Sequence, residues 1–227
     1  LWSNSTGAYL DVGSDRNTIS FSTMIGAAAD GYGFIADDSD ANILTQSYMW
    51  GGAYGAYFVG SCDYNQISLS TMIGSAQAGL LAQASDSNTV TQTYMWGGSR
   101  GAYLASAADY NVISLSTMIG NSLYGFTANG SDSNLVTQSR LTGGQRGAFL
   151  DAGADFNTIS LSTMTSNVVN FSGLYLFQGS SNTVVDSYIQ GSTAALVTGS
   201  TGTMIGGSVL VATNTAGAAL ALTGGNV

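Results

Sequence analysis

Residues 85–95 read Ser-Asp-Ser-Asn-Thr-Val-Thr-Gln-Thr-Tyr-Met, and residues 108–118 return to the same pattern as Ala-Asp-Tyr-Asn-Val-Ile-Ser-Leu-Ser-Thr-Met. The Asn in each stretch belongs to a series whose members lie 23 or 25 residues apart along the chain. A fixed period of this size indicates a solenoid built from similar stacked coils. The series consists of Asn17, Asn42, Asn65, Asn88, Asn111, Asn134, Asn157 and Asn182.

Other positions keep a constant distance from each Asn. An aliphatic residue follows two positions later, a Ser or Thr five later and a large apolar residue seven later. The segments are short, rich in Val, Ile, Thr and Ser, and bounded by Gly, Asp and Asn, which is typical of strands and turns. A single coil cannot bury its apolar face and must stack on its neighbours. We therefore expect the aliphatic column to form a core, the Ser column to mark an inward corner, and each Asn to take a left-handed conformation.

These stretches, together with Asp-Phe-Asn-Thr-Ile-Ser-Leu-Ser-Thr-Met at 155–164, resemble right-handed parallel β-helices of the pectate-lyase-like superfamily. That superfamily includes phage tailspikes, polysaccharide lyases and epimerases, and surface adhesins. The resemblance covers roughly residues 7–190. It implies an all-β fold, a β-solenoid with about 23 residues per coil, and two alternating coil types give a double repeat of 46 residues.

The domain organisation follows from the same repeat. We expect one β-helix domain over residues 1–227, with about nine or ten coils. The coils are regular to about residue 190 and irregular over 191–227. The chain is interpreted as a segment of a longer protein.

The composition limits the chemistry. The chain has no Pro, Lys, Glu or His, and its charges are 13 Asp and four Arg, which give a net charge of −9. This charge argues against nucleic acid or an anionic membrane as a partner. No apolar run is long enough to insert into a bilayer. Catalysis by His or Lys is excluded, and the single Cys62 permits no internal disulfide.

An Asp stands two residues before seven of the eight Asn. We expect these carboxylates to accept backbone N–H groups at the turns. A row of Ca²⁺ ions is the alternative, although one Asp per coil supplies few of the six to eight oxygens that Ca²⁺ takes. No cofactor is otherwise expected. The metal candidates are Asp40, Asp63, Asp86, Asp109 and Asp132.

A column of aromatic residues stands eight positions before the Asn series. It is expected to face outward as a protein interface or a ligand groove, and the alternative that these rings fill the core stays open. Its aromatic members in the first seven coils are Tyr9, Phe34, Tyr57, Tyr103, Phe126 and Phe149.

Trp50 and Trp96 each follow Tyr-Met and precede Gly-Gly in alternate coils. Planar rings on a rigid face suit the apolar faces of sugars, and packing of a corner is the alternative. Arg100 and Arg146 are close in sequence to these positions and suit the carboxylates of an acidic glycan.

These observations predict a rigid, non-catalytic β-helix on a cell surface, on a virion or elsewhere outside the cell, acting in structure or adhesion. The expected partners are copies of the chain, as a trimer or stacked end to end, and a surface glycan. One alternative is a polysaccharide lyase, hydrolase or epimerase that uses Asp37, Asp38 and the arginines. The other is an ice-binding solenoid that uses the Ser and Thr column three residues after the first seven Asn.

Overall fold

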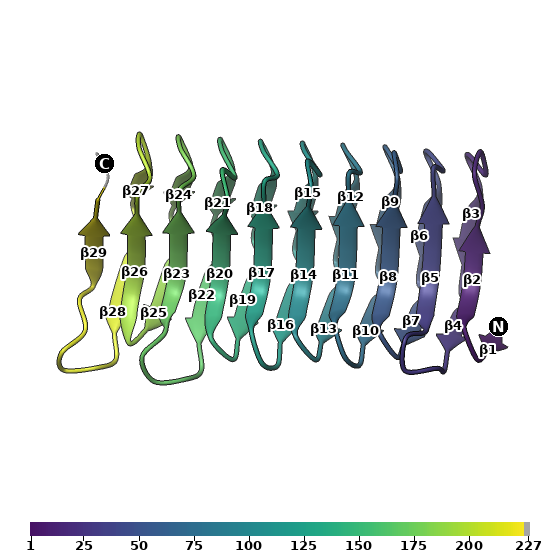
Figure 1. Ribbon diagram of the computed structural model, residues 1–227, viewed down its shortest axis with the longest axis horizontal. Coiled ribbons are helices and arrows are strands. Elements are labelled where there is room, and N and C mark those ends of the chain that lie inside the picture. The colour runs from purple at the N-terminus through teal and green to yellow at the C-terminus, as the bar shows by residue number, and fades with distance from the viewer. Residues whose placement is uncertain (225–227) are drawn as a thin grey trace.

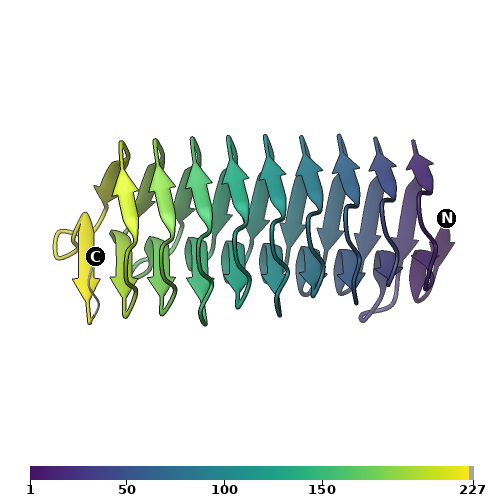
Figure 2. The same ribbon diagram turned by 90° about the horizontal axis from the view of Figure 1, so that it is seen from above.

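The computed structural model describes residues 1–224, which form 29 strands and contain no helix. The strands wind into a right-handed parallel β-helix of ten coils, as the sequence predicts (Figure 1). Each coil contributes one strand to each of three parallel sheets, here called A, B and C in the order in which a coil enters them. The tenth coil has strands in sheets A and B only, within the described residues. Figure 2 shows the stack from above, with the two chain ends at opposite ends of the rod.

The strand bounds repeat closely from coil to coil. Sheet A contains β1 (Trp2–Ser3), β4 (Thr23–Gly26), β7 (Tyr48–Gly51), β10 (Thr71–Gly74), β13 (Tyr94–Gly97), β16 (Thr117–Gly120), β19 (Arg140–Gly143), β22 (Thr163–Ser166), β25 (Tyr188–Gly191) and β28 (Val209–Ala212). Sheet B contains β2 (Thr6–Leu10), β5 (Tyr32–Asp37), β8 (Tyr54–Val59), β11 (Ala78–Gln83), β14 (Arg100–Ala105), β17 (Tyr124–Asn129), β20 (Arg146–Asp151), β23 (Ser172–Phe177), β26 (Thr193–Thr198) and β29 (Leu220–Thr223). Sheet C contains β3 (Thr18–Ser20), β6 (Ile43–Thr45), β9 (Gln66–Ser68), β12 (Thr89–Thr91), β15 (Val112–Ser114), β18 (Leu135–Thr137), β21 (Thr158–Ser160), β24 (Thr183–Val185) and β27 (Met204–Gly206).

The later coils continue the same sheets. Residues 193–223 add β26 to β29 to them, and residues 225–227 of the terminal region lie outside the described part of the chain. No helix of the described residues has the length and apolar character needed to cross a membrane.

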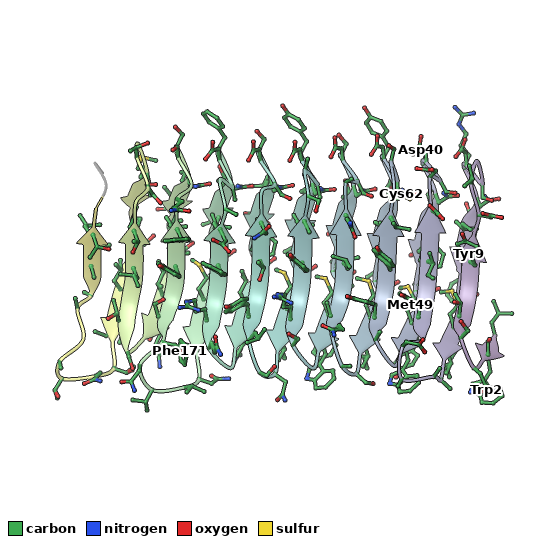
Figure 3. All side chains as sticks on the ribbon, viewed as in Figure 1. Trp2, Tyr9, Asp40, Met49, Cys62 and Phe171 are labelled. Carbon is green, nitrogen blue, oxygen red and sulfur yellow. The ribbon has the colours of Figure 1, made fainter. Side chains whose placement is uncertain are left out.

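The core consists of inward-facing columns, one from each sheet. The middle residue of each sheet C strand is the predicted aliphatic position, and it is buried from Leu44 to Val184. The large apolar column lies inside sheet A, where Met49 pairs with Met72 of the next coil (Figure 3). Sheet B contributes rings such as Phe34 and Phe58. Both predicted core columns are confirmed.

The expectation that each Asn is left-handed is wrong. The residue before each Asn has a positive φ, between 55° and 58°, and the Asn itself turns inward. The Asn88 side chain accepts the N–H of Asn65 at 2.7 Å and donates to the Cys62 carbonyl at 2.8 Å. The Asn88 N–H in turn donates to Oδ1 of Asn111 at 2.9 Å. Because these buried amides satisfy main-chain groups of the coil before, the Asn column ties successive coils together.

The Ser column lies at an inward corner, as predicted. Ser70 Oγ accepts the N–H of Ser47 at 3.1 Å and donates to the Ser68 carbonyl at 2.7 Å. The hydroxyls therefore bond to the main chain rather than to one another. The residue before each Ser again has a positive φ, between 48° and 51°.

Alternate coils differ in where one turn residue is placed. Between sheets A and B, three residues (75–77) connect β10 to β11, whereas two residues (98–99) connect β13 to β14. Between sheets B and C the order reverses: five residues (84–88) connect β11 to β12, and six residues (106–111) connect β14 to β15. Each coil thus keeps its length while its sheet B strand shifts by one residue relative to the Asn. This exchange is the structural basis of the double repeat.

Candidate functional site

The outer face of sheet B gathers aromatic rings and two guanidinium groups on six of the seven adjacent strands from β5 to β23, with Ala78 and Leu81 at these positions on the remaining strand, β11. We call this surface the aromatic–arginine face. It consists of Tyr32, Tyr54, Tyr57, Arg100, Tyr103, Tyr124, Arg146, Phe149, Phe171, Tyr175 and Phe177.

A Gly at the second position of each of these seven strands allows two side chains to face outward, although each strand has only six residues. In β8, Tyr54 and Tyr57 are both partly exposed, while Ala56 and Phe58 are buried. A Cβ on Gly55 would lie 2.6 Å from the Gly79 carbonyl oxygen and would also meet the backbone N of Ile73. Only Gly fits this close approach between sheets B and A. The Gly interrupts the inward–outward alternation and leaves Tyr54 outside.

The first half of the face is a cluster of tyrosines. The Tyr54 ring centroid lies 5.7 Å from that of Tyr32 and 5.5 Å from that of Tyr57, with the rings nearly parallel. The Tyr57 hydroxyl donates to Oε1 of Gln83 at 2.9 Å. Burial raises the pKa of the Tyr54 and Tyr57 phenols, so both remain neutral hydrogen-bonding groups at neutral pH.

The second half alternates arginine and tyrosine along the axis. Arg100, Tyr124 and Arg146 occupy the same register position on successive strands β14, β17 and β20. The Tyr124 ring centroid lies 5.7 Å from the Arg100 guanidinium carbon and 5.6 Å from that of Arg146. These distances are within the range of a cation–π contact. Tyr124 therefore lies between two positive charges, on a protein whose net charge is −9.

Arg146 lies in an aromatic cage. Its guanidinium carbon is 4.7 Å from the Tyr175 centroid, 5.2 Å from that of Phe149 and 5.3 Å from that of Phe171. Phe171 comes from the five-residue loop 167–171, which protrudes from the lower edge of the rod in Figure 1 and lengthens this coil to 25 residues. The Nε atoms of Arg100 and Arg146 are buried and have no hydrogen-bond partner. Both guanidinium groups are held in place mainly by ring contacts rather than by carboxylates.

Polar groups follow the far edge of the face, at the ends of the sheet B strands. Asn129 Nδ2 donates to Oδ2 of Asp151 at 3.3 Å. At the first coils, the Tyr9 hydroxyl donates to Oδ2 of Asp37 at 3.0 Å, and this hydrogen bond raises the pKa of Tyr9 to about 12. The face thus combines flat rings, two cations and amide and carboxylate groups.

The predicted aromatic column divides between two environments. Tyr57, Tyr103 and Phe149 lie on the aromatic–arginine face, and Tyr9 is half exposed on the first coil. Phe34 and Phe126 are buried in the core, which corrects the outward orientation that the count from Asn predicts. The exchange of one turn residue between alternate coils causes this difference.

The predicted Trp positions lie on another sheet. Trp50 and Trp96 point outward from sheet A, where they alternate in register with Ile73. They are therefore on a different side of the rod from Arg100 and Arg146, which are close to them only in sequence. Sequence reasoning assigned no role to Tyr124, Phe171 or Asp151, because the register of sheet B and the fold of the 167–171 loop are three-dimensional properties.

The Asp column forms a ladder between coils. Asp109 Oδ1 accepts the N–H of Asp132 at 2.6 Å, and the Asp109 N–H donates to Oδ1 of Asp86 at 2.7 Å. Partial burial and neighbouring carboxylates raise the pKa of Asp63 and Asp109, while the bonds to the next coil's N–H oppose that shift. Figure 3 shows Asp40 near the tip of its turn.

The metal prediction concerns this same ladder. Within residues 1–224, no three His, Cys, Asp or Glu side chains come together as a group that could hold a metal ion. One oxygen of each of Asp40, Asp63, Asp86, Asp109 and Asp132 accepts a backbone N–H of the next coil. Calcium binding at this column stays a prediction.

The acidic pair Asp37 and Asp38 is not brought to Arg100 or Arg146, whereas Arg16 lies on the neighbouring turn, where its backbone N–H donates to the Asp40 carbonyl at 2.9 Å. Asp37 ends β5, three strands from Arg100 and five from Arg146. At the inter-strand spacing, these separations are about 14 Å and about 24 Å. Asp38 lies in the following turn, where its Oδ1 accepts the Ser61 N–H at 2.9 Å.

Six of the seven Met side chains and Cys62 lie inside the rod, whereas Met204 in β27 is 53% exposed. Met24, Met49, Met72, Met95, Met118 and Met164 are fully buried among apolar side chains. Cys62 replaces a turn Ser, accepts the Ser39 N–H at 3.4 Å and donates to the Val59 carbonyl at 3.2 Å. Burial raises the pKa of the Cys62 thiol to about 11, which keeps it protonated.

Alignments with solved structures of similar fold cover most of this chain. The crystal structure of the Dettilon tailspike protein has a TM-score of 0.76 and 11% sequence identity, and the alignment covers 95% of this chain and 48% of that one. The crystal structure of the T265N mutant of the periplasmic alginate epimerase AlgG has a TM-score of 0.60 and 12% identity, with coverage of 91% and 49%. The chain thus spans about half the length of these proteins, and at such identities the likeness concerns the fold alone. No curated protein matches the sequence.

The sequence itself matches one family. Residues 1–173 match the family described as periplasmic copper-binding protein (NosD). This region holds the first seven coils and the beginning of the eighth, including Arg100, Tyr124, Arg146 and Phe149 of the aromatic–arginine face. Because the match extends over more than three-quarters of the 227 residues, the chain belongs to the NosD family of β-helix proteins.

Proposed function

We propose that this chain is a non-catalytic β-helix of the periplasm or cell exterior that binds an anionic polysaccharide along its aromatic–arginine face. One observation carries the proposal: Arg100 and Arg146 lie in one register file with Tyr124 between them, and both are held by aromatic rings. The pectate-lyase-like fold and the likeness to a tailspike and a periplasmic epimerase support a location outside the cytoplasm.

The geometry suits an extended ligand that runs along the rod. Arg100 and Arg146 are two strands apart, which corresponds to about 9.6 Å. A polysaccharide parallel to the axis can place carboxylates at both guanidinium groups, each of which offers paired N–H donors. Sugar rings between them would pack against the partly exposed rings of Tyr103, Tyr124 and Phe149. The rigid sheet holds these groups in place before binding, so little ordering is required on association.

The charge distribution supports an anionic rather than a neutral ligand. Contact with rings on one side removes water from each guanidinium, and a partly desolvated charge favours an opposite charge in the ligand. Weakening of binding at high salt is therefore expected, since screening reduces this attraction. Two of the protein's four Arg residues are in this face.

A purely binding role is favoured over cleavage by the separation of the acidic and basic groups. General acid–base chemistry needs its groups within hydrogen-bond reach of one bond. Asp37 and Asp38 lie three or more strands from Arg100 and Arg146 of the aromatic–arginine face, and the chain has no His, Lys or Glu to replace them.

Copper, which the family description names, does not fit the donors of this chain. Copper sites use imidazole or soft sulfur ligands, and the sequence contains no His. The Met thioethers of coils two to eight and the Cys62 thiol are enclosed in the apolar core, which leaves the single exposed thioether of Met204 as the sulfur ligand that solvent reaches, and one thioether does not make a copper site. No function through copper is derived for this chain.

Calorimetric titration with an oligouronate tests the proposal. Arg146→Ala is expected to weaken binding at least tenfold, since a charge-assisted hydrogen bond of about 1.5–3 kcal/mol is lost. Arg140→Ala is the matched control, because Arg140 is an exposed arginine on sheet A and its removal changes the net charge equally. Equal affinities of the two variants, or no binding by the unmodified chain, would contradict the proposal.

The same oligouronate incubated with the protein distinguishes binding from catalysis. We expect the oligosaccharide to be recovered unchanged, without new reducing ends or unsaturated products. Cleavage or epimerisation that Asp38→Ala abolishes would instead establish the enzymatic alternative.

A further inference from the structure

Sheet C, on another side of the rod from the aromatic–arginine face, is bordered by two rows of projecting side chains. Both rows occupy the positive-φ positions at its corners. The first row, here called the tyrosine row, is Arg16, Ala41, Tyr64, Ser87, Tyr110, Ser133, Phe156 and Ser181. The second, the leucine row, is Phe21, Gln46, Leu69, Gln92, Leu115, Gln138, Leu161 and Asp186.

The large apolar members of both rows are among the most exposed apolar side chains of the described residues. Tyr64, Tyr110 and Phe156 are 62–65% exposed, and Leu69, Leu115 and Leu161 are 52–58% exposed. A bulky side chain at positive φ is unfavourable, whereas Asn or Gly adopts this conformation readily. Folding buries less than half of each of these side chains, so their presence at strained positions points to contacts made outside the chain.

The apolar members are in phase across the sheet. Tyr64 and Leu69 belong to one coil, as do Tyr110 and Leu115, and Phe156 and Leu161. The intervening coils carry Ser87 and Gln92, or Ser133 and Gln138. Apolar and polar layers thus alternate over coils three to seven, while in the first coil Phe21 is paired with Arg16. Between Phe21 and Leu69 of the leucine row, the corner opens into a groove of about 550 Å³ that Gln46 and Tyr48 also line.

The floor between the rows is uncharged and consists of two files of outward side chains along the rod, of which the first includes the larger Ile43, Gln66 and Leu135 and the second has only Ser, Thr and Val. The file next to the tyrosine row contains Thr18, Ile43, Gln66, Thr89, Val112, Leu135, Thr158 and Thr183. The file next to the leucine row contains Ser20, Thr45, Ser68, Thr91, Ser114, Thr137, Ser160 and Val185. In the second file, hydroxyls pair between coils, as Ser114 does with Thr91 at 3.1 Å, which fixes their rotamers.

We propose that two copies of this chain associate face to face through sheet C, side by side and parallel, about a two-fold axis that runs along the rods. Such an axis brings the tyrosine row of each copy against the leucine row of the other without any shift along the rod. Tyr64 then meets the partner's Leu69, and Tyr110 meets the partner's Leu115, so apolar layers match apolar layers. The same operation sets the first file of each copy against the second file of the other, as Leu135 against the partner's Thr137.

Charge excludes the other two-fold arrangement. The Asp ladder follows the tyrosine-row corner, because each Asp directly precedes a residue of that row. An antiparallel pair would bring the two Asp ladders together. It would also set the first file of one copy, with its larger side chains, against the first file of the other. The parallel pair separates the ladders by the width of the sheet. This width, five residues from Tyr110 to Leu115, is about 16 Å.

The available area suits a dimer. Nine strands at the inter-strand spacing extend over about 38 Å. With the width between the rows, each copy offers about 600 Å² and the pair buries about 1,200 Å², the lower limit for a stable interface. A face whose two bordering rows differ and fit one another suits an isologous two-fold contact.

Sedimentation velocity over a range of concentrations tests the association. The unmodified chain is expected to form a dimer, and Leu69→Asn with Leu115→Asn is expected to raise the dissociation constant at least tenfold. Asn adopts positive φ more readily than Leu, so these substitutions preserve the fold, and circular dichroism checks that the double variant melts no lower than the original chain. Gln92→Asn with Gln138→Asn, in the polar layers of the same row, is the matched control and is expected to leave the dissociation constant unchanged.

Cross-linking tests the orientation. Each variant carries Cys62→Ser, which restores the residue found at this turn in neighbouring coils. A short bismaleimide is expected to join Tyr110→Cys to Leu115→Cys when the two variants are mixed, and to join neither variant to itself. Self-linking of Tyr110→Cys would overturn the parallel arrangement. A monomer at 100 μM or a trimer in sedimentation, including a monomer that binds ice through this face, would overturn the dimer.

Discussion

At the scale of single residues, the Asp ladder has two opposing effects, and substitution at Asp109 separates them. Its Oδ1 accepts the Asp132 N–H, while its charge lies between those of Asp86 and Asp132. Asp109→Asn keeps an acceptor oxygen and removes the repulsion. We expect it to raise the free energy of unfolding at pH 7 by roughly 0.5 kcal/mol, as for exposed charge pairs. Asp109→Ala removes the acceptor as well and should cost about 1 kcal/mol relative to Asp109→Asn.

The pH dependence follows from the raised pKa of Asp109. Because the folded state holds the proton more tightly than the unfolded state, this group's contribution to stability is fully present below its ordinary pKa of 3.8 and is lost as pH rises through the raised value. The advantage of Asp109→Asn over the unmodified chain should therefore disappear below about pH 3.8. Urea unfolding at pH 3 and pH 7 measures both differences. A gain that is equal at the two pH values would contradict this account.

Residue patterns predict the core but not every conformation. The aliphatic and Met columns could be assigned from spacing, because burial follows directly from the strand period. The pattern predicts the left-handed position one residue too late. Asn is the familiar residue for positive φ, yet here its amide is more useful inside, where it bonds to buried main-chain groups of the preceding coil. Tyr64 or Ser87 takes the strained conformation instead.

At the scale of elements, turns and strands differ in their tolerance of length changes. Ala107 is exposed, has a φ of 61° and lies in the longer kind of turn between sheets B and C. Deleting it gives the five-residue turn found in alternate coils, so the neighbouring strands keep their register. Deleting Ala102 inside β14 moves Leu104 from the core face to the outside, because side chains alternate along a strand.

We expect the Ala107 deletion to cost about 1 kcal/mol, in the range of surface changes, and the Ala102 deletion to cost at least 3 kcal/mol, as for loss of a buried large side chain. Thermal and urea unfolding followed by circular dichroism compare the two. Similar losses from both deletions would show that the sheet B register is not fixed by its alternation.

The same turn exchange limited what could be predicted of the candidate site. A constant count from Asn places Phe34 and Phe126 with Tyr57 and Phe149, although the alternating turn lengths put the first two inside. The arginines were identified from sequence by their charge type. Their companions Tyr124 and Phe171 were not, because the contact depends on strand register and on how the 167–171 loop folds back.

At the scale of the whole molecule, the three sheets divide the roles. The inner columns supply stability, sheet B carries the proposed ligand face and sheet C the proposed partner face. A stack in which each coil contacts its neighbours gains its stability from successive interfaces, so the position of a defect along the rod matters. The Asn ladder offers a direct comparison, because the same residue type occurs at an end and in the middle.

Asn111 lies in the middle of the rod, where its amide accepts the Asn88 N–H at 2.9 Å and donates to the Ser85 carbonyl at 3.0 Å. Asn17 is exposed in the first coil, and its side chain donates only to Oδ1 of Asn42, at 3.1 Å. Asn111→Ala leaves two buried main-chain groups without partners and is expected to cost about 2–4 kcal/mol, whereas Asn17→Ala should cost less than about 1 kcal/mol. Urea unfolding measures both.

Hydrogen exchange of Asn111→Ala should show the greatest loss of protection in the two coils that flank residue 111, because each coil is stabilised by its neighbours. Uniform loss along the rod would instead indicate that all ten coils unfold as one unit.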